Sequence, residues 1–356
     1  MINNYRSYVM NIDFDELISL ENLLQSWRVY KAGKSAKMEV MEFERHLEDN
    51  LFDLHYDLRE GNYRHGGYEY FRISDPKKRD IYKASVRDRV LHQAIYVYLC
   101  KVYEPIFVSM SFSSRKKKGV HKAVSCLQKT ANNLQRGRQN CLAMKCDIRK
   151  YFDSINHRIL LEILTEEIVD KKVLRLLMMI IESFRPKDGK GVPLGNITSQ
   201  IFANVYLNEL DVFVLNRLGL KDYVRYNDDF IIMAHDKESL FTDTAKIREF
   251  VRDKLMLDLP ENKTIFRKLV WGIDFCGSIV LPNAIMLRNK TKGRMFDNLD
   301  RKLERLRMGQ RSNSDFQKVA DSYFGLLSHA KSYNLRMKIK NRYIYVSGSF
   351  LNFARV

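Results

Sequence analysis

Two adjacent aspartates, Asp228 and Asp229, lie between two short apolar runs of the kind that form β-strands. Residues 223–225 precede them and residues 230–233 follow, so the pattern predicts a tight hairpin that carries both acids at its turn. Neighbouring strand residues face opposite sides of a sheet, so two acids in succession are costly unless a divalent cation compensates their charge. A metal site and a solvated turn are both compatible with this stretch alone.

A third aspartate, Asp147, lies 81 residues upstream of Asp228, just after the apolar segment 141–144. A helical pattern follows at residues 156–162, which predicts a strand that ends at the acid and turns into a helix. Ligand sites gather at such strand ends, although a single aspartate there is more often only a favourable charge at a helix N-terminus. With Asp228 and Asp229 it completes the set of acids, drawn from two elements, that a palm-type nucleotidyl transferase needs to hold two metal ions.

These segments resemble the palm of a reverse transcriptase. Residues 147–153 follow the D-x-x-x-[FY]-F-D run of that family, and residues 226–229 follow its Y-x-D-D box with an asparagine at the variable position. Residues 191–200 lie where reverse transcriptases keep a nucleotide-binding segment, usually Q-G-x-x-x-S-P. Because Leu194 replaces the glutamine and Gln200 replaces the proline, this segment resembles the reverse transcriptases of diversity-generating retroelements more than those of retroviruses, retrons or group II introns.

Further segments resemble the same family in the same order, so the resemblance covers about residues 40–340. They are the fingers motif at 71–81 and 85–94, the lysine-bearing loop at 259–264, the primer-gripping hairpin at 274–277 and a thumb segment at 322–330.

The resemblance implies a role for each acid. Asp147 and Asp228 are expected to bridge two Mg²⁺ ions, for which Mn²⁺ can substitute, while Asp229 makes a weaker contact. The backbone carbonyl of Ile148 is an expected additional ligand. Lys263 is expected to protonate the departing pyrophosphate, and the alternative is an ordinary surface lysine.

The resemblance also implies which residues hold the substrates. Phe152 is expected beneath the sugar of the incoming nucleotide, where its ring would exclude a 2′-hydroxyl and select dNTPs; otherwise it is a core phenylalanine. Cationic residues of the fingers are expected to clamp the triphosphate, first Lys83 and Arg89 and then Arg79 and Arg87, unless they form a merely solvated basic face. The remaining expected contacts are Leu194, Gly195 and Gln200 for the nucleotide and Phe275, Cys276 and Gly277 for the primer end.

The elements that must position these residues follow from periodicity and from glycines. Leucines at 47, 51, 54 and 58 predict one amphipathic helix within residues 40–60, closed by Gly61. Gly66 and Gly67 precede predicted short strands around Phe71 and Ile81. Further helices are expected at 87–102, from about 121, at 170–184, at 199–218 and, as a basic amphipathic helix, around 294–311.

The predicted fold class is α+β: a right-hand polymerase with fingers, a palm whose antiparallel sheet packs on helices, and a helical thumb. The expected divisions are an N-terminal helical segment at 1–70, fingers and palm at 71–280 and a basic helical thumb at 281–356. Only 79 residues follow Gly277, which we expect to suffice for a thumb but not for an added maturase, endonuclease or RNase H domain.

The composition favours a polyanionic partner. There are 61 Lys and Arg against 43 Asp and Glu, a net charge of +18, so template RNA and the cDNA or primer are the expected partners, with solubility or an acidic membrane as alternatives. Five cysteines without a C-x-x-C pair suit a reducing compartment. No secretory segment opens the chain and the most apolar stretch, 176–181, is too short for a bilayer. We therefore expect a soluble protein of the bacterial cytoplasm or of a phage-infected host.

Three functions remain open at the level of sequence. The diversity-generating class is the first, a retron-like or other stand-alone bacterial reverse transcriptase the second, and an inactive RNA-binding polymerase scaffold the third. The first implies a template-repeat RNA, misincorporation opposite adenine and a small, basic, oligomeric accessory protein. Leu194 bears on this class, because an apolar residue in place of a hydrogen-bonding glutamine predicts low fidelity.

Overall fold

The computed structural model describes residues 13–74, 77–136, 141–184, 189–310 and 312–343, and the backbone of 345–346 and 349–350. Residues 75 and 76 of the fingers motif lie outside this set. The chain divides into two compact units and passes back and forth between them. The first consists of Met1–Lys116, Ile148–Gly219 and Thr244–Pro260, and the second of Lys117–Asp147, Leu220–Asp243 and Glu261–Val356.

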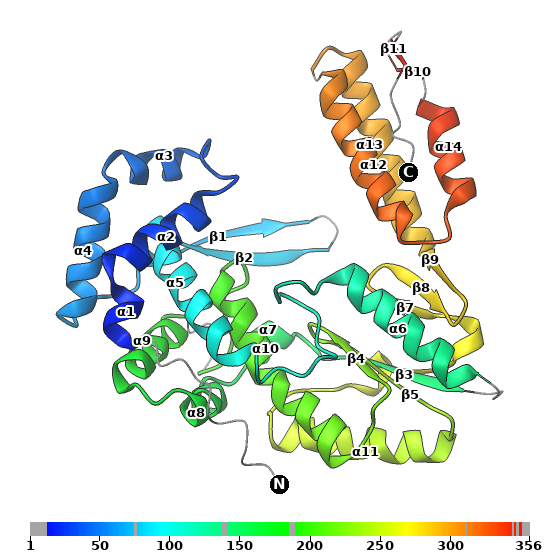
Figure 1. Ribbon diagram of the computed structural model, residues 1–356, viewed down its shortest axis with the longest axis horizontal. Coiled ribbons are helices and arrows are strands. Elements are labelled where there is room, and N and C mark those ends of the chain that lie inside the picture. Colours follow the sequence, from blue (N-terminus) through cyan, green and yellow to red (C-terminus); the bar gives the residue numbers. More distant parts are fainter. Residues whose placement is uncertain are drawn as a thin grey trace. The chain divides into compact units, whose positions relative to one another are not determined.

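The first unit is mainly helical and carries one β-hairpin (Figure 1). Its elements are α1 (Phe14–Ile18), α2 (Leu20–Lys31), α3 (Met38–Arg45), α4 (Leu47–Arg59), β1 (Tyr68–Ile73), β2 (Arg79–Ala84), α5 (Val86–Tyr103), α7 (Tyr151–Ser154), α8 (His157–Glu167), α9 (Lys171–Glu182) and α10 (Ile197–Val212), followed by a π-helix (Phe213–Arg217).

The centre of this unit is formed by α5 and α10, which pack against each other, with α2 on α5. Ser85 begins α5 as its N-cap, because its hydroxyl accepts the backbone N–H of Asp88. Apolar side chains on several sides of α5 and α10 are buried, which is typical of helices enclosed by a core. Ser85 also separates β2 from α5, so the hairpin β1–β2 leads directly into this helix.

The helix predicted from the leucines within residues 40–60 is confirmed as α4, although it does not fill that range. The structure has two helices, α3 and α4, which meet at His46, whose φ of −119° and ψ of 39° are not helical. Val40 and Phe43 are buried from α3, while Leu51, Leu54 and Leu58 of the predicted stripe are buried from α4 and Leu47 is half-buried. The pattern of leucines was correct from residue 47 onward, and Gly61, with φ of +72°, follows the helix end.

Among its described residues, the second unit carries a four-stranded, a three-stranded and a two-stranded antiparallel sheet, together with the C-terminal helices (Figure 1). Its elements are α6 (Val120–Gln135), β3 (Leu142–Asp147), β4 (Tyr223–Tyr226), β5 (Asp229–Ala234), β6 (Thr264–Lys268), β7 (Ile273–Phe275), β8 (Ser278–Leu281), β9 (Ala284–Leu287), α12 (Asn289–Arg307), α13 (Asn313–Ser328), α14 (Tyr333–Tyr343) and the short strands β10 (Tyr345–Val346) and β11 (Ser349–Phe350), with α11 (Lys237–Asp253) crossing between the units.

The larger sheet has the strand order β4-β5-β3-β6, and every neighbouring pair is antiparallel. Its central strands are apolar: Phe230, Ile231 and Ile232 in β5 are fully buried, and α6 packs against β4 and β5. The second sheet, β7-β8-β9, is also antiparallel and contacts α6 through β8 and β9. An antiparallel sheet packed on a helix is the arrangement predicted for the palm.

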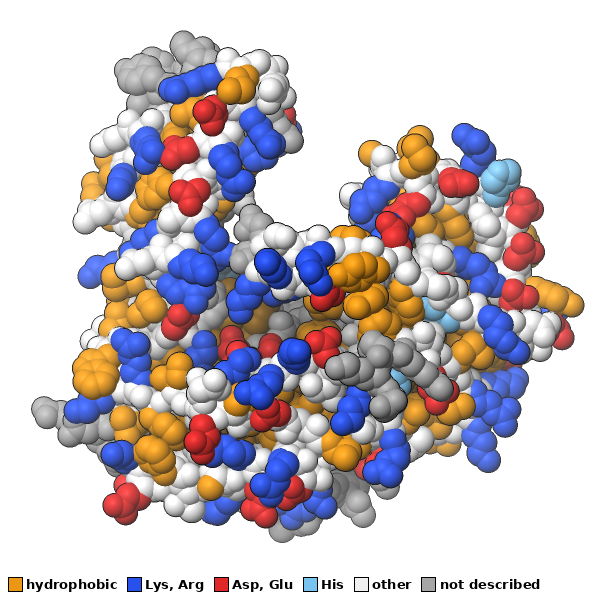
Figure 2. All heavy atoms as spheres, turned by 180° about the vertical axis from the view of Figure 1, so that it is seen from behind, with side chains coloured by type: hydrophobic (Ala, Val, Ile, Leu, Met, Phe, Trp, Pro, Cys, Tyr) orange, Lys and Arg blue, Asp and Glu red, His pale blue; other side chains and the backbone are white. Residues whose placement is uncertain are grey.

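The C-terminal helices have their own core, which includes Leu299, Phe316, Phe324 and Ile339. The basic amphipathic helix predicted near residue 294 is confirmed as α12, with Met295, Leu299 and Leu306 buried. Over the face shown in Figure 2, Lys and Arg side chains are widely spread among the acidic ones.

The fold class is α+β, as predicted, with antiparallel sheets and helices that are consistent with a right-hand polymerase. Across the described residues, no helix combines the length and the apolar character that a membrane span requires. The proposed division at residues 70 and 280 stays a prediction.

Candidate active site

The three aspartates meet at one end of the larger sheet. Asp147 is the last residue of β3 and lies directly opposite Asp229, the first residue of β5. Tyr226 pairs with Asp229, so only Asn227 and Asp228 form the turn between β4 and β5. Asn227 has φ of +53°, a conformation that asparagine tolerates better than most residues and that two-residue hairpins require. The predicted hairpin is confirmed, with Asp228 in its turn and Asp229 at the start of β5.

The negative charges of the three aspartates repel one another. The pKa of Asp228 is raised to about 6, chiefly by burial and also by the negative charges of Asp147 and Asp229 and a hydrogen bond with Asp147, against a lowering contribution from the backbone N–H of Asp228. A cation in this position would relieve the repulsion, because it favours the charged form of each carboxylate.

Two lysines partly balance the acids. The Nζ of Lys263 donates to Asp147 Oδ2 at 2.9 Å, and the Nζ of Lys145 lies 3.6 Å from Asp229 Oδ1. Lys263 was expected near the reacting groups, whereas Lys145 was missed. Its position carried a signal: it precedes Asp147 by two residues on one strand, so both side chains leave the same face of the sheet.

A buried arginine holds the turn. Arg225 is 1% exposed, and its Nη1 donates to the backbone carbonyl of Asn227 at 3.1 Å. The bond satisfies a carbonyl group of the turn from within the hairpin, so the conformation at Asn227 and Asp228 does not depend on solvent.

The residues present fit a magnesium site that is completed by substrate. Over the described ranges, no three His, Cys, Asp or Glu side chains converge as a self-sufficient metal cage. Magnesium does not need one, since it is commonly held by one or two carboxylates together with water and substrate phosphates. Asp147 and Asp228, with excess negative charge and a raised pKa at Asp228, provide that kind of donor set.

The expected primer grip lies in the same unit. Phe275 is fully buried at the end of β7, and Cys276 and Gly277 form the two-residue turn to β8 with φ of +49° and +82°. The pKa of the Cys276 thiol in this turn is raised to about 12, chiefly by burial and also by the charge of Asp229, one of the three acids. Lys145 joins the two, because its Nζ also donates to the backbone carbonyl of Asp274 at 2.9 Å.

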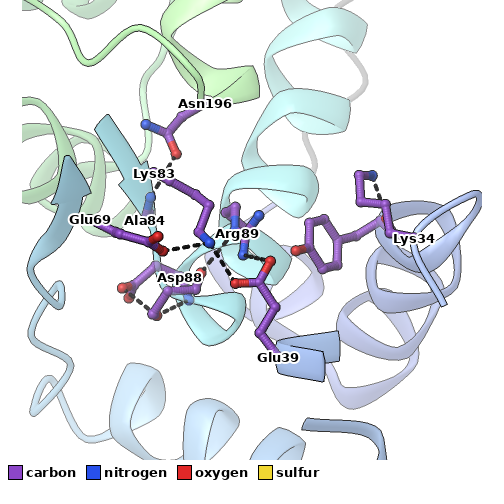
Figure 3. A network of polar contacts seen from close by, with 10 residues as sticks. Lys34, Glu39, Glu69, Lys83, Ala84, Asp88, Arg89 and Asn196 are labelled. Atoms are coloured by element: carbon purple, nitrogen blue, oxygen red, sulfur yellow. Dashed lines mark hydrogen bonds and ion pairs between the residues drawn. The ribbon is translucent and has the colours of Figure 1, made fainter. Parts of the chain in front are cut away.

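The expected triphosphate residues lie in the first unit, and three of the four are engaged by carboxylates. Lys83 forms ion pairs with Glu39 at 2.7 Å and with Glu69 at 2.5 Å, and Arg89 forms one with Glu39 at 3.1 Å (Figure 3). Arg87 forms an ion pair with Asp57 at 2.6 Å. Arg79 stands apart as an exposed residue at the start of β2.

The nucleotide-binding segment lies against the fingers hairpin in that unit. The backbone N–H of Tyr82 in β2 donates to the carbonyl of Leu194 at 2.9 Å, and the N–H of Val192 donates to the carbonyl of Phe152 at 2.9 Å. Leu194 and Phe152 are half-buried and Gln200 is exposed on α10. The structure thus brings Phe152 and the loop together by their backbones, and it buries the side chain of Ile148 completely.

Comparison with known proteins identifies the family. Residues 74–280 match the reverse transcriptase (RNA-dependent DNA polymerase) family. The chain belongs to the reverse transcriptase family. The matched span includes the three aspartates, Lys263 and the hairpin at Cys276.

Two curated relatives agree with this membership. The chain is 29% identical over 249 residues to protein YkfC of Escherichia coli, covering 58% of the chain and 64% of that protein. It is 26% identical over 258 residues to the group II intron-encoded protein LtrA of Lactococcus lactis, covering 53% of the chain and 42% of LtrA. The chain therefore spans less than two thirds of either relative.

Among solved structures, the apo telomerase of Candida tropicalis, truncated from its C-terminal domain, aligns with a TM-score of 0.48 and 13% identity. The alignment covers 68% of this chain and 60% of that one.

Proposed function

We propose that this protein is an RNA-directed DNA polymerase that copies a template RNA into cDNA by adding dNTPs to a primer end. The observation that carries the proposal is the meeting of Asp147, Asp228 and Asp229 at adjacent strand ends, in a chain that belongs to the reverse transcriptase family. The regions 1–70, 71–280 and 281–356, as N-terminal helices, fingers with palm, and thumb, are part of the proposal.

Two Mg²⁺ ions, with Mn²⁺ as an alternative, belong to the same proposal. When bound, they would supply Lewis-acid neutralisation of the triphosphate and of the attacking 3′-oxygen. Asp147 and Asp228 would hold both ions, with Asp229 and the backbone carbonyl of Ile148 as weaker donors. The raised pKa of Asp228 supports this assignment, because it reflects a site with more negative charge than its surroundings balance.

The remaining residues position the substrates and move protons. Lys263, held at Asp147, carries a proton on Nζ that it can give to the leaving pyrophosphate. Phe152 would meet a 2′-hydroxyl, and Phe275, Cys276 and Gly277 would support the primer end.

For the triphosphate clamp we place Arg79 ahead of Lys83, Arg87 and Arg89. Those three have carboxylate partners, and a phosphate would have to displace them. Arg79 is exposed at the start of β2, on the same hairpin. A bidentate guanidinium suits a phosphate well.

Substitution of Asp228 by Asn tests the proposal. Because the change removes a shared ligand while keeping the size of the side chain, incorporation of dNTPs on a primed RNA template should fall by at least 10³-fold. RNA binding should stay within about two-fold, since it rests on many cations. The control is Asp253→Asn, an exposed acid of α11. A D228N enzyme that retains activity within a few-fold of the parent would show that the hairpin is not the metal site.

We further propose that the enzyme belongs to the diversity-generating class and is error-prone opposite template adenine. The support is the form of residues 194–200, in which Leu194 stands where most relatives use a hydrogen-bonding glutamine. Apolar pockets discriminate by only about 1–3 kcal/mol, whereas unmet hydrogen bonds penalise a misfit more strongly. Leu194 is half-buried, so its side chain is available for such an apolar contact.

The test is the substitution Leu194→Gln. Misincorporation opposite adenine should fall several-fold, because each ~1.4 kcal/mol of restored discrimination corresponds to a factor of ten. Error rates are measured for each template base by sequencing the cDNA. A rate that does not change would leave Leu194 as a packing residue and remove the support for the mutagenic class.

Partners follow from the charges. For template RNA, the exposed side of α14 offers Tyr333, Asn334, Met337, Lys338 and Arg342 along one groove, which combines an aromatic ring with cations.

For a small basic accessory protein, α4 offers an acidic face in which the exposed rings of Phe52 and Tyr56 alternate with acids. Acidic side chains follow one another along the right-hand edge of Figure 2, where α4 lies.

A further inference from the structure

Asn196 occupies a helix-capping position without capping the helix. It is the N-cap residue of α10, where asparagine is favoured because its side chain normally accepts a backbone N–H of the first turn. Within α10, all of whose residues are described, no backbone N–H donates to this side chain. The carboxamide is nevertheless buried, since Asn196 is only 2% exposed. Its hydrogen bonds must therefore go to another element.

That element is the outer edge of β2. The Nδ2 of Asn196 donates to the carbonyl of Tyr82 at 2.8 Å, and its Oδ1 accepts the backbone N–H of Ala84 at 3.2 Å. Two residues earlier, the carbonyl of Leu194 accepts the N–H of Tyr82 at 2.9 Å. The carboxamide thus takes the place of a peptide group, and the loop extends the β1–β2 hairpin by an irregular third strand. Figure 3 shows Asn196 reaching the backbone at Ala84.

The backbone of the loop lies close against β2 at Gly195. Gly195 has φ of +121°, and a Cβ at this position would lie 2.8 Å from Ile81 Cγ2 and 3.5 Å from the carbonyl oxygen of Tyr82. Only glycine fits this conformation and this space. Leu194 is therefore fixed between the bond to Tyr82 on one side and Gly195 on the other.

Ion pairs of the Lys83 side chain also hold the end of β2, separately from the contacts with Asn196. Lys83, which lies between the two residues that bond to Asn196, pairs with Glu39 of α3 and with Glu69 of β1. Arg89 of α5 reaches the same Glu39 carboxylate. Figure 3 shows Lys83 and Arg89 both reaching Glu39, and Lys83 also reaching Glu69. The end of β2 is thus a fixed reference against which the loop is aligned.

We propose that Asn196 is a positioning residue that sets the register of the nucleotide-binding loop, Leu194–Gly195, against the fingers hairpin. The inference rests on the proposed polymerase function, because it assigns Leu194 to the pocket of the incoming nucleotide. Asn196 touches no substrate; it acts by holding Leu194 where a nucleotide would meet it. Loss of the two bonds should free the loop and weaken both nucleotide binding and base selection.

The decisive variant is Asn196→Ser. Serine is an equally good N-cap, so it can cap α10, while its short side chain cannot span to both Tyr82 and Ala84. Asn196→Asp is the second variant, since it keeps the acceptor for Ala84 but turns a carboxylate oxygen toward the Tyr82 carbonyl. The matched control is Asn204→Ser, which alters another buried asparagine of α10, one that donates to the carbonyl of Ser113 at 2.8 Å.

Steady-state incorporation on a primed RNA template should show a KM for dNTP raised at least ten-fold in both Asn196 variants, with kcat changed less and the Kd for primer–template unchanged. Misincorporation per base should change in the same variants and stay at the parent level in N204S. A merely structural role would lower the active fraction, and so kcat, without moving KM.

The outcomes separate the two proposals. If the parent protein incorporates no dNTP, the polymerase function itself fails. If the parent is active, N196S melts within a few degrees of it, and KM and error rate match those of N204S within two-fold, the positioning role is overturned.

Discussion

At the scale of single residues, Lys145 has the most consequential contacts outside the acids themselves. Its ammonium group lies 3.6 Å from Asp229 and donates to the carbonyl of Asp274, which is in the strand that leads into the primer-grip turn. The side chain is 22% exposed, so this charge is only partly screened by water. One residue therefore connects the strand end of the acid cluster with the hairpin expected to hold the primer.

Substitution of Lys145 by Met should uncouple these two parts. The chain length is kept while the charge and the donor are lost, so the hairpin is no longer tied to β3. We expect the KM for primer–template to rise about ten-fold with a smaller change in the KM for dNTP. Initial rates at varied primer–template concentration measure this effect.

Lys145→Arg should recover most of the loss, because it restores the cation. The control Lys268→Met alters an exposed lysine of β6. Equal effects on the two Michaelis constants would rule out a role specific to the primer hairpin.

Residue types predicted the acids but not their partners. Asp147, Asp228 and Asp229 were found because acids at strand ends and turns carry a local signal. Lys83 and Arg89 looked equally suited to a triphosphate, since nothing near them in the chain reveals that Glu39, more than 40 residues earlier, lies beside both. Long-range ion pairs depend on tertiary packing. In the sequence alone, a lysine or arginine therefore looks available for a phosphate even when a distant carboxylate already pairs with it.

At the scale of elements, a pair of stacked histidines joins the loop before β1 to α5. The rings of His65 and His92 are 5.1 Å apart, and their Nε2 atoms are 3.1 Å apart. Because His65 Nδ1 lies 2.6 Å from the carbonyl of Gly66 and is its donor, the Nε2 of His65 accepts a hydrogen bond from His92. The Nδ1 of His92 is then a buried lone pair, and the described residues offer it no donor.

This arrangement predicts a loss of stability in acid. The pKa of His92 is lowered to about 3, chiefly by burial and also by the charge of His65, so the folded state keeps His92 neutral while the unfolded state protonates it near 6.5. Below pH 6.5 the unfolded chain binds the extra proton. The contribution of His92 therefore declines by about 1.4 kcal/mol per pH unit, or about 2 kcal/mol between pH 6.5 and 5.

Urea unfolding at several pH values can measure this contribution. In H92Q, which keeps an N–H donor but does not titrate, the free energy of unfolding should fall less between pH 6.5 and 5, by about 2 kcal/mol. Substitution of the exposed His46 by Gln should leave the parent slope intact. A slope in H92Q equal to that of the parent would exclude His92 as the source.

Helices and strands were predicted correctly where residues in the local sequence mark their ends. Their ends were missed where tertiary packing sets them. The β4–β5 hairpin follows from Asn227 at the turn, and β3 follows from its apolar run. The break at His46 has no glycine or proline to announce it and arises because α3 and α4 bury their side chains separately. Asn196 was missed for a related reason, since an asparagine before a helix is typical of a cap and its actual partner is a distant strand.

Across the whole molecule, charge is distributed by region. Residues 13–60 contain 12 acidic and 6 basic residues, whereas residues 289–343 contain 14 basic and 5 acidic ones. The net charge of +18 is therefore an average over an acidic N-terminal region and a strongly basic C-terminal one. A polyanion should be drawn to the C-terminal helices and away from the N-terminal ones.

This asymmetry predicts the salt dependence of RNA binding. Lys338 lies on the groove of α14, so K338Q should weaken the binding of single-stranded RNA at low salt. It should also reduce the slope of log K against log [salt] by about 0.7, the value of one phosphate contact. The slope is measured by fluorescence anisotropy at salt concentrations from about 50 to about 300 mM.

The matched control is Lys172→Gln, which removes an exposed cation of α9 in the other unit. An unchanged slope in K338Q, or an equal drop in the control, would mean that α14 does not contact RNA phosphates.

The interleaving of the two units has a consequence for the order of folding. The strands β3 and β5 that bring the acids together are separated by the whole of α7 to α10, which belongs to the other unit. Pairing across such a sequence separation closes a long loop and is slow compared with the formation of local helices. During synthesis, the acid cluster cannot form until β5 has been made, and β6 completes the sheet still later. The basic helices α12 to α14 are made after both strands, so a nascent chain should complete the acid cluster before it gains the surface expected to attract RNA.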